Sequence, residues 1–172
     1  MRILLTGITG FLGRQLAPML GDHELFAISR GSHKSGFQPD NINWIEADLS
    51  QHLDPAILPA SMDAIIHLAQ SDHYRSFPDG AADMFKVNVE VPAILLAWAQ
   101  KAGVSRFVAA STGTVYEPFT GAMTENSSVS PTGYYGASKL AAEALALAYQ
   151  GVFDVCQLRV FFLYGPRQEG MM

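Results

Sequence analysis

The sequence of 172 residues has little cysteine, little charge and no long hydrophobic run. Cys156 is its one cysteine, which excludes an intramolecular disulfide framework and a cysteine-based zinc cluster; the simplest interpretation is a cytoplasmic protein. Eleven Lys and Arg against sixteen Asp and Glu give a net charge of −5, so we expect no nucleic-acid partner. The most apolar stretch, 91–99, is far shorter than the roughly 20 residues that span a bilayer, so we expect no membrane segment.

The scarcity of charge also bears on architecture. Only 16% of residues are charged, whereas soluble domains average about 25%. Such a composition favours a parallel sheet covered by helices on both faces, or a subunit that buries surface against a partner.

Short apolar runs alternate with helical patterns along the chain. We expect strands at 1–6, 24–29, 42–47, 62–69, 105–111 and 153–163, and helices at 11–20, 81–102 and 134–150. Pro92 predicts a kink or a late start in the helix at 81–102. Residues 112–133 are predicted to form a long loop. This alternation predicts an α/β fold with a doubly wound parallel sheet and strand order 3-2-1-4-5-6. Ligands of such sheets bind beyond the carboxyl ends of the strands.

A glycine-rich turn follows the first predicted strand and opens the first predicted helix. It contains Gly7, Gly10 and Gly13 at the spacing G-x-x-G-x-x-G, with Phe11 and Leu12 at the helix start. Backbone N–H groups and the helix dipole can hold a pyrophosphate there, and glycines allow its close approach. The alternative is a tight turn that binds nothing.

The end of the second predicted strand bears on which dinucleotide could bind. An acidic residue for the ribose hydroxyls is expected there, but the chain has Arg30, with Lys34 close behind. A guanidinium suits a 2′-phosphate, so we expect NADP in preference to NAD; a solvated basic turn is the alternative. Asp48, after the third strand, could accept from the adenine amino group or be a plain loop aspartate.

Tyr135 and Lys139 are four residues apart at the start of a helix, on one face. A tyrosine that acts as a base near neutral pH needs its pKa of about 10 lowered by about 3. A nearby ammonium, a helix start and an oxidised nicotinamide all act in that direction. Thr112, at the end of the fifth strand, adds a hydroxyl at the same sheet edge. A simple surface pair on the helix is the alternative for Tyr135 and Lys139.

Together these motifs resemble the extended short-chain dehydrogenase/reductase family, the NAD(P)-dependent epimerases and dehydratases. The matching pieces are Thr6 to Gly13, Asp48-Leu49, His67-Leu68-Ala69, Asn88-Val89, Ser111 to Tyr116, Tyr135 to Lys139, Leu158-Arg159 and Tyr164-Gly165-Pro166. The resemblance implies a Rossmann-type dinucleotide-binding domain over residues 1–172, with Tyr135 as acid/base and Thr112 bonded to the reacting oxygen. It further implies that Lys139 lowers the tyrosine pKa and holds the nicotinamide ribose. Leu68 and Ala69 would line the cofactor, and Leu49 would lie beside it.

The chain departs from the family pattern in two ways. Phe162 stands where the family has an asparagine that contacts substrate. Family members also continue into a C-terminal lobe that closes over the substrate, whereas this sequence ends at Met172, so we expect that lobe to be absent. We expect His67 to be structural, and the remaining histidines show no metal spacing, so no metal is predicted.

Two functions follow as hypotheses. The first is an NAD(P)-dependent oxidoreductase, epimerase or dehydratase that acts on a hydroxyl or carbonyl carbon, with a nucleotide sugar or related small molecule as substrate. The second is a truncated or non-catalytic dinucleotide-binding protein. The helices at 81–102 and 134–150 are the candidates for a homodimer interface.

Overall fold

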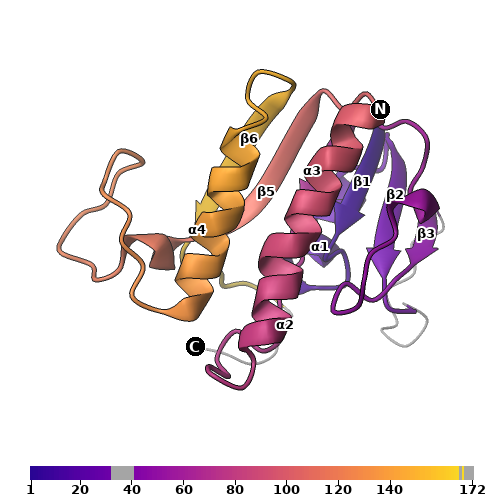
Figure 1. Ribbon diagram of the computed structural model, residues 1–172. Helices are drawn as coiled ribbons and strands as arrows, with labels where there is room; N and C mark the ends of the chain where they lie inside the picture. Colours follow the sequence, from indigo (N-terminus) through magenta and orange to yellow (C-terminus); the bar gives the residue numbers. More distant parts are fainter. Residues whose placement is uncertain (32–40, 167, 169–172) are drawn as a thin grey trace.

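The computed structural model describes residues 1–31, 41–166 and 168, and its centre is one six-stranded sheet in which all strands are parallel. The strand order is β3-β2-β1-β4-β5-β6, which confirms the predicted doubly wound topology (Figure 1). The strands are β1 (Arg2–Thr6), β2 (Glu24–Ser29), β3 (Ile42–Glu46), β4 (Ala64–His67), β5 (Arg106–Thr112) and β6 (Asp154–Val160).

Helices cover the sheet from both faces. The chain forms α1 (Phe11–Met19), α2 (Ala81–Phe85), α3 (Val91–Lys101) and α4 (Tyr134–Leu147), with short 3₁₀ turns at Pro55–Ile57 and Gly113–Tyr116. In Figure 1, α3 and α4 lie side by side in front of the sheet. Neighbouring residues of β1 show why both faces are buried: Ile3 and Leu5 pack in a cluster with α1, and Leu4 packs with α3.

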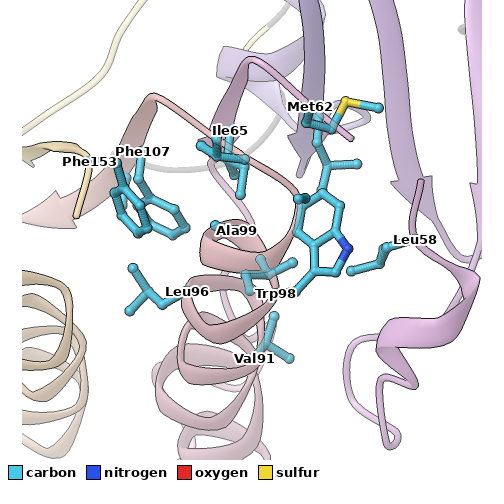
Figure 2. Close-up of a cluster of buried hydrophobic side chains, with 14 of the residues drawn as sticks. Leu58, Met62, Ile65, Val91, Leu96, Trp98, Ala99, Phe107 and Phe153 are labelled. Carbon is cyan, nitrogen blue, oxygen red and sulfur yellow. The ribbon is translucent and has the colours of Figure 1, made fainter. Parts of the chain in front are cut away.

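The larger apolar cluster fixes α3 against the sheet. Leu96 and Ala99 of α3 pack toward Ile65 of β4 and Phe107 of β5, and the Phe107 and Phe153 rings stack at 6.3 Å (Figure 2). Because apolar burial is the dominant favourable term in folding, this cluster fixes α3 against the first residues of β4 and β5.

The region around Pro92 contains a π-helical turn that the sequence did not predict. The helix begins at Ala81, and a π-helical turn at Lys86–Glu90, labelled η3, joins α2 to α3 without a break. The Val91 N–H bonds to the Lys86 carbonyl five residues back. The α-helix α3 therefore starts late, at Val91 with Pro92 in its first turn, as Pro92 predicted. Proline lacks the N–H that an α-helical ladder would use there, which explains the change of register.

Other boundaries shift by a few residues. β6 ends at Val160 rather than at 163, α4 ends at Leu147, and the predicted loop 112–133 contains the 3₁₀ turn Gly113–Tyr116. No helix in the described part of the chain is both long enough and apolar enough to cross a membrane.

Candidate functional site

Most of the predicted site residues follow the carboxyl ends of β1, β4 and β5, which are neighbours in the sheet. Thr6 pairs in register with His67, and His67 pairs with Ala109. The glycine turn, the segment after β4, Thr112 and the start of α4 therefore lie at the sheet edge where parallel sheets bind ligands.

The glycine turn is built for close backbone packing. Gly7 has a φ of +73°, and a Cβ placed on it would lie 2.6 Å from the Ala69 nitrogen. A Cβ on Gly13 would lie 2.5 Å from the Ile8 Cα, so α1 can pack on the turn only without a side chain at that position.

The first turn of α1 is open toward solvent at Gly10. This exposed residue is the helix N-cap and provides no side-chain bond to the helix amides, and Phe11 and Leu12 follow it half-buried. A Cβ on Gly10 would meet only the Gly7 carbonyl, at 3.2 Å. The turn therefore offers uncapped N–H groups, a positive helix end and space, which are the features that hold a pyrophosphate.

A buried bond ties the glycine turn to the segment after β4. The Ala69 N–H donates to Thr6 Oγ1 at 3.2 Å, and Thr6 Oγ1 lies 2.7 Å from His67 Nδ1. His67 is 1% exposed, and burial, assisted by the charge of Lys139, lowers its pKa to about 3. His67 is thus a neutral packing residue that fixes Leu68 and Ala69 beside the turn. Among the described residues no group of His, Cys, Asp or Glu is arranged as a metal site.

The residues predicted for the adenosine end are present at the ends of β2 and β3. Arg30 is exposed and forms an ion pair with Asp72 at 3.0 Å; Lys34 lies outside the described residues. Asp48 Oδ1 accepts from the Ser50 N–H at 2.9 Å and from Ser50 Oγ at 2.8 Å. Burial acts to raise the pKa of Asp48, but these bonds and Arg30 outweigh it and lower the pKa. Leu49 packs against the larger apolar cluster.

Tyr135 and Thr112 interact, and Tyr135 has a partner that the sequence did not indicate. The phenol donates to Gln70 Oε1 at 2.7 Å, and the Tyr135 and Tyr74 rings lie 5.5 Å apart. Thr112 is 7% exposed; its Oγ1 accepts from the Thr114 N–H and so also starts the 3₁₀ turn.

The predicted lowering of the tyrosine pKa relied partly on an oxidised nicotinamide; the chain's own groups shift the pKa of Tyr135 in the opposite direction. Burial raises the pKa of Tyr135; a hydrogen bond with Thr112 lowers it and Tyr74 raises it, and the net change is upward. Lys139, on the same helix face, is 4% exposed, and burial lowers its own pKa to about 8 while Glu143 acts in the opposite direction. Loss of water around the phenol therefore outweighs the hydrogen bond with Thr112.

Asn88 connects the π-helical turn to the tyrosine helix. Its Oδ1 accepts from the Ser71 N–H at 3.0 Å, and its Nδ2 donates to Ser138 Oγ at 3.0 Å. Ser138 Oγ in turn donates to the Tyr135 carbonyl at 2.8 Å. The sequence pattern predicts no role for Asn88, although a polar residue in the middle of an apolar helix is an indication of one.

The sequence pattern also predicts no role for Glu143 or for Arg159, although Leu158-Arg159 is one of the matching pieces. Arg159 of β6 donates from Nη2 to Glu143 Oε2 at 2.7 Å, and Glu143 is 3% exposed. The positions four and eight residues before Glu143 are Lys139 and Tyr135, so the helical spacing would have placed the carboxylate on the site face.

Comparisons with known proteins agree with this geometry. A sequence model described as the NAD dependent epimerase/dehydratase family matches residues 3–172. The uncharacterized UDP-glucose epimerase YtcB of Bacillus subtilis (strain 168) is 32% identical over 190 residues, covering 98% of this chain and 58% of that protein. A dTDP-glucose 4,6-dehydratase of Streptomyces griseus is 30% identical, covering 96% of this chain and 55% of that protein.

Solved structures show the same fold. UDP-glucuronic acid 4-epimerase from Bacillus cereus, in complex with UDP-glucuronic acid and NAD, superposes with a TM-score of 0.86 at 26% identity, covering 100% of this chain and 60% of that one. DesIV, a dTDP-glucose 4,6-dehydratase from Streptomyces venezuelae with NAD and TYD bound, gives a TM-score of 0.81 at 30% identity, with 98% and 58% covered. The chain thus spans 55–60% of the length of these relatives.

Proposed function

Because the chain belongs to the NAD dependent epimerase/dehydratase family, we propose that it binds NAD(P) at its glycine turn and acts on a hydroxyl-bearing carbon of a nucleotide sugar. The observation that carries this proposal is the convergence of the uncapped glycine turn with Thr112, Tyr135 and Lys139 at one sheet edge. Relatives named as UDP-glucose epimerase and dTDP-glucose 4,6-dehydratase support the substrate class.

The fit of the dinucleotide rests on the chain's own backbone. Gly7, Gly10 and Gly13 would receive the pyrophosphate at the start of α1, where a Cβ would fill the space or clash. Asp48 and Leu49 would lie beside the adenine, and Leu68 and Ala69 would line the cofactor. Lys139 would hold the nicotinamide ribose. The bound nicotinamide would supply a hydride acceptor or donor.

Tyr135 would move the proton in the reaction. Its phenol would accept the proton of a substrate hydroxyl, or return one, while Thr112 bonds the same oxygen. The Tyr135 hydroxyl now donates to Gln70, so substrate would replace Gln70 as its hydrogen-bond partner. A raised pKa suits Tyr135 as a proton donor; Lys139 and a bound oxidised nicotinamide would lower that pKa for the reverse role.

Arg30 would decide between the two dinucleotides. Its exposed guanidinium pairs with Asp72, and a ribose 2′-phosphate would compete with that carboxylate for the same donor. The two solved relatives hold NAD, so the proposed NADP preference depends on the basic residues after β2, of which Arg30 is described.

The proposal is tested by assay of the chain with NAD(P) and, in turn, UDP-glucose, UDP-glucuronic acid and dTDP-glucose, with products identified by NMR. We expect Tyr135→Phe to lower turnover by at least about 100-fold, because general acid–base catalysis contributes about that much. Tyr134→Phe is the matched control, since Tyr134 stacks on Phe77 and lies outside the proposed site. Undiminished turnover by Tyr135→Phe would refute the mechanism.

A second candidate function is dinucleotide binding without turnover. Phe162, 88% exposed, favours it, because it provides no polar group at the position where the family's asparagine contacts substrate. Binding of NAD(P) without any product from the three sugar nucleotides would support this candidate over the first.

A further inference from the structure

Three ionisable side chains follow one another at four-residue intervals along α4. Tyr135, Lys139 and Glu143 therefore share one face of the helix. Lys139 is 4% exposed and Glu143 is 3% exposed, so both charges are almost fully removed from water. The proposed chemistry uses Tyr135 and Lys139 but assigns nothing to the carboxylate.

Glu143 is held more firmly than any other carboxylate with a described ion pair. Arg159 donates from Nη2 to Oε2 at 2.7 Å and from Nε to both oxygens at 3.1 Å, and Ser111 Oγ donates to Oε1. The Arg159 Nη1 donates to the Tyr116 hydroxyl at 2.6 Å and to the Glu125 carbonyl at 3.3 Å. The carboxylate is thereby locked between β5, β6 and the start of the 112–133 segment.

Stability alone does not account for this arrangement. Replacing a buried ion pair with well-packed apolar residues is often neutral or stabilising, because both charges must be desolvated. The two members of the ion pair differ in their position relative to Lys139. The Glu143 carboxylate lies on the same helix as Lys139, one turn away, whereas the Arg159 guanidinium comes from β6.

Among the described groups around Lys139, Glu143 is the source of negative charge. His67 of β4 lines a small internal cavity together with Lys139 and Ser111, and burial keeps His67 neutral by lowering its pKa to about 3. Tyr135 is protonated, since its hydroxyl donates to Gln70. Burial lowers the pKa of Lys139 to about 8, and Glu143 opposes that fall.

We propose that Glu143 is a positioning residue, whose carboxylate, locked by Arg159 and Ser111, keeps Lys139 in its ammonium form inside the site. The effect of Glu143 on cofactor binding rests on the proposed function, whereas its effect on the charge of Lys139 does not.

The charge of Lys139 is measured directly by NMR. The chain has four lysines, so ¹³C-lysine labelling gives few Cε resonances, and Lys139→Met identifies the one to follow during a pH titration. In Glu143→Gln the midpoint for Lys139 should fall by at least about 1, a tenfold change in the ratio of its two forms. Glu24→Gln, which removes an exposed carboxylate at the start of β2, is the matched control and should leave the midpoint in place.

Two further variants separate an electrostatic role from a structural one. Glu143→Asp keeps the charge and should restore most of the wild-type midpoint. Arg159→Met removes the cation that neutralises Glu143 and should raise the midpoint, the opposite direction from Glu143→Gln. The proposal is overturned if the Lys139 midpoint is unchanged in Glu143→Gln, or if it shifts in the same direction in Glu143→Gln and Arg159→Met. If Glu143→Gln does not fold, the direction of the shift in Arg159→Met decides: a raised midpoint supports the proposal, and an unchanged or lowered one overturns it.

Cofactor binding gives the second measurement. If Lys139 holds the ribose, the pH above which NAD affinity falls should move down with the Lys139 midpoint in Glu143→Gln. If Lys139→Met binds NAD as well as the wild type does, the proposed role of Lys139 in holding the ribose fails. A lowered Lys139 midpoint in Glu143→Gln would still support the action of Glu143 on Lys139.

Discussion

At Gly7 two separate properties of glycine are used. The φ of +73° allows the chain to leave β1 in a tight turn, and the missing side chain allows the backbone at Leu68 and Ala69 to approach. Thr6 fixes that approach by accepting the Ala69 N–H. The motif spacing predicted the turn, but the contact with Ala69 depends on the pairing of β1 with β4 and becomes visible only in the folded chain.

The residue-scale prediction for cofactor choice concerns Arg30. Loss of a charge-assisted hydrogen bond costs about 1.5–3 kcal/mol, so Arg30→Ala should lower the affinity for NADPH relative to NADH by about 10- to 100-fold. Asp72→Asn should raise the NADPH affinity, because it frees the guanidinium from its ion pair. Fluorescence titration with both dinucleotides measures the ratio.

Arg106→Ala provides the control for this test. Arg106 forms a comparable exposed ion pair, with Asp154 at 3.1 Å, but at the amino ends of β5 and β6. Equal affinities of the wild type for NADPH and NADH would remove the assignment of Arg30 altogether.

At the scale of elements, the π-helical turn is the feature that joins the helical layer to the site. It places Asn88, 1% exposed, between the segment after β4 and the first turn of α4. Hydrophobic periodicity located the helix from Ala81, but the change to five-residue hydrogen bonding beside Pro92 arises from local backbone geometry that a residue pattern does not encode.

We therefore expect Asn88→Ala to destabilise the chain. It leaves the buried Ser71 N–H without its acceptor and removes the donor to Ser138 Oγ, which should lower the free energy of unfolding by about 2–4 kcal/mol. Urea denaturation measures the loss. Asn43→Ala, at an exposed position of β3, should change the value by less than about 1 kcal/mol, and a similar loss in both variants would contradict the assigned role.

At the scale of the whole molecule, the proposed dimer concerns the outer surface of the helical layer. Phe85, Leu145 and Leu147 are 53%, 40% and 50% exposed on α2 and α4, and the low charge content of the chain is consistent with association. We propose that these two helices pair in a homodimer.

Sedimentation equilibrium at micromolar concentration should then give twice the chain mass of 18.6 kDa. Leu145→Glu should shift the equilibrium to the monomer, because a charge would be buried in the interface. Val152→Glu, at a residue 52% exposed beyond α4, is the control. A monomeric wild type would refute the dimer.

The sequence by itself determined the order of strands and helices, the glycine turn and the identity of Thr112, Tyr135 and Lys139, because spacing and apolar periodicity are local properties. Only the tertiary structure decided the electrostatic state of those residues. The pKa of Tyr135 rises and that of Lys139 falls because burial removes solvating water. Gln70 and Asn88 contact α4 from segments distant in the sequence, and Arg159 reaches Glu143 from β6. Desolvation and long-range contacts depend on the packed chain, so no local pattern contains them.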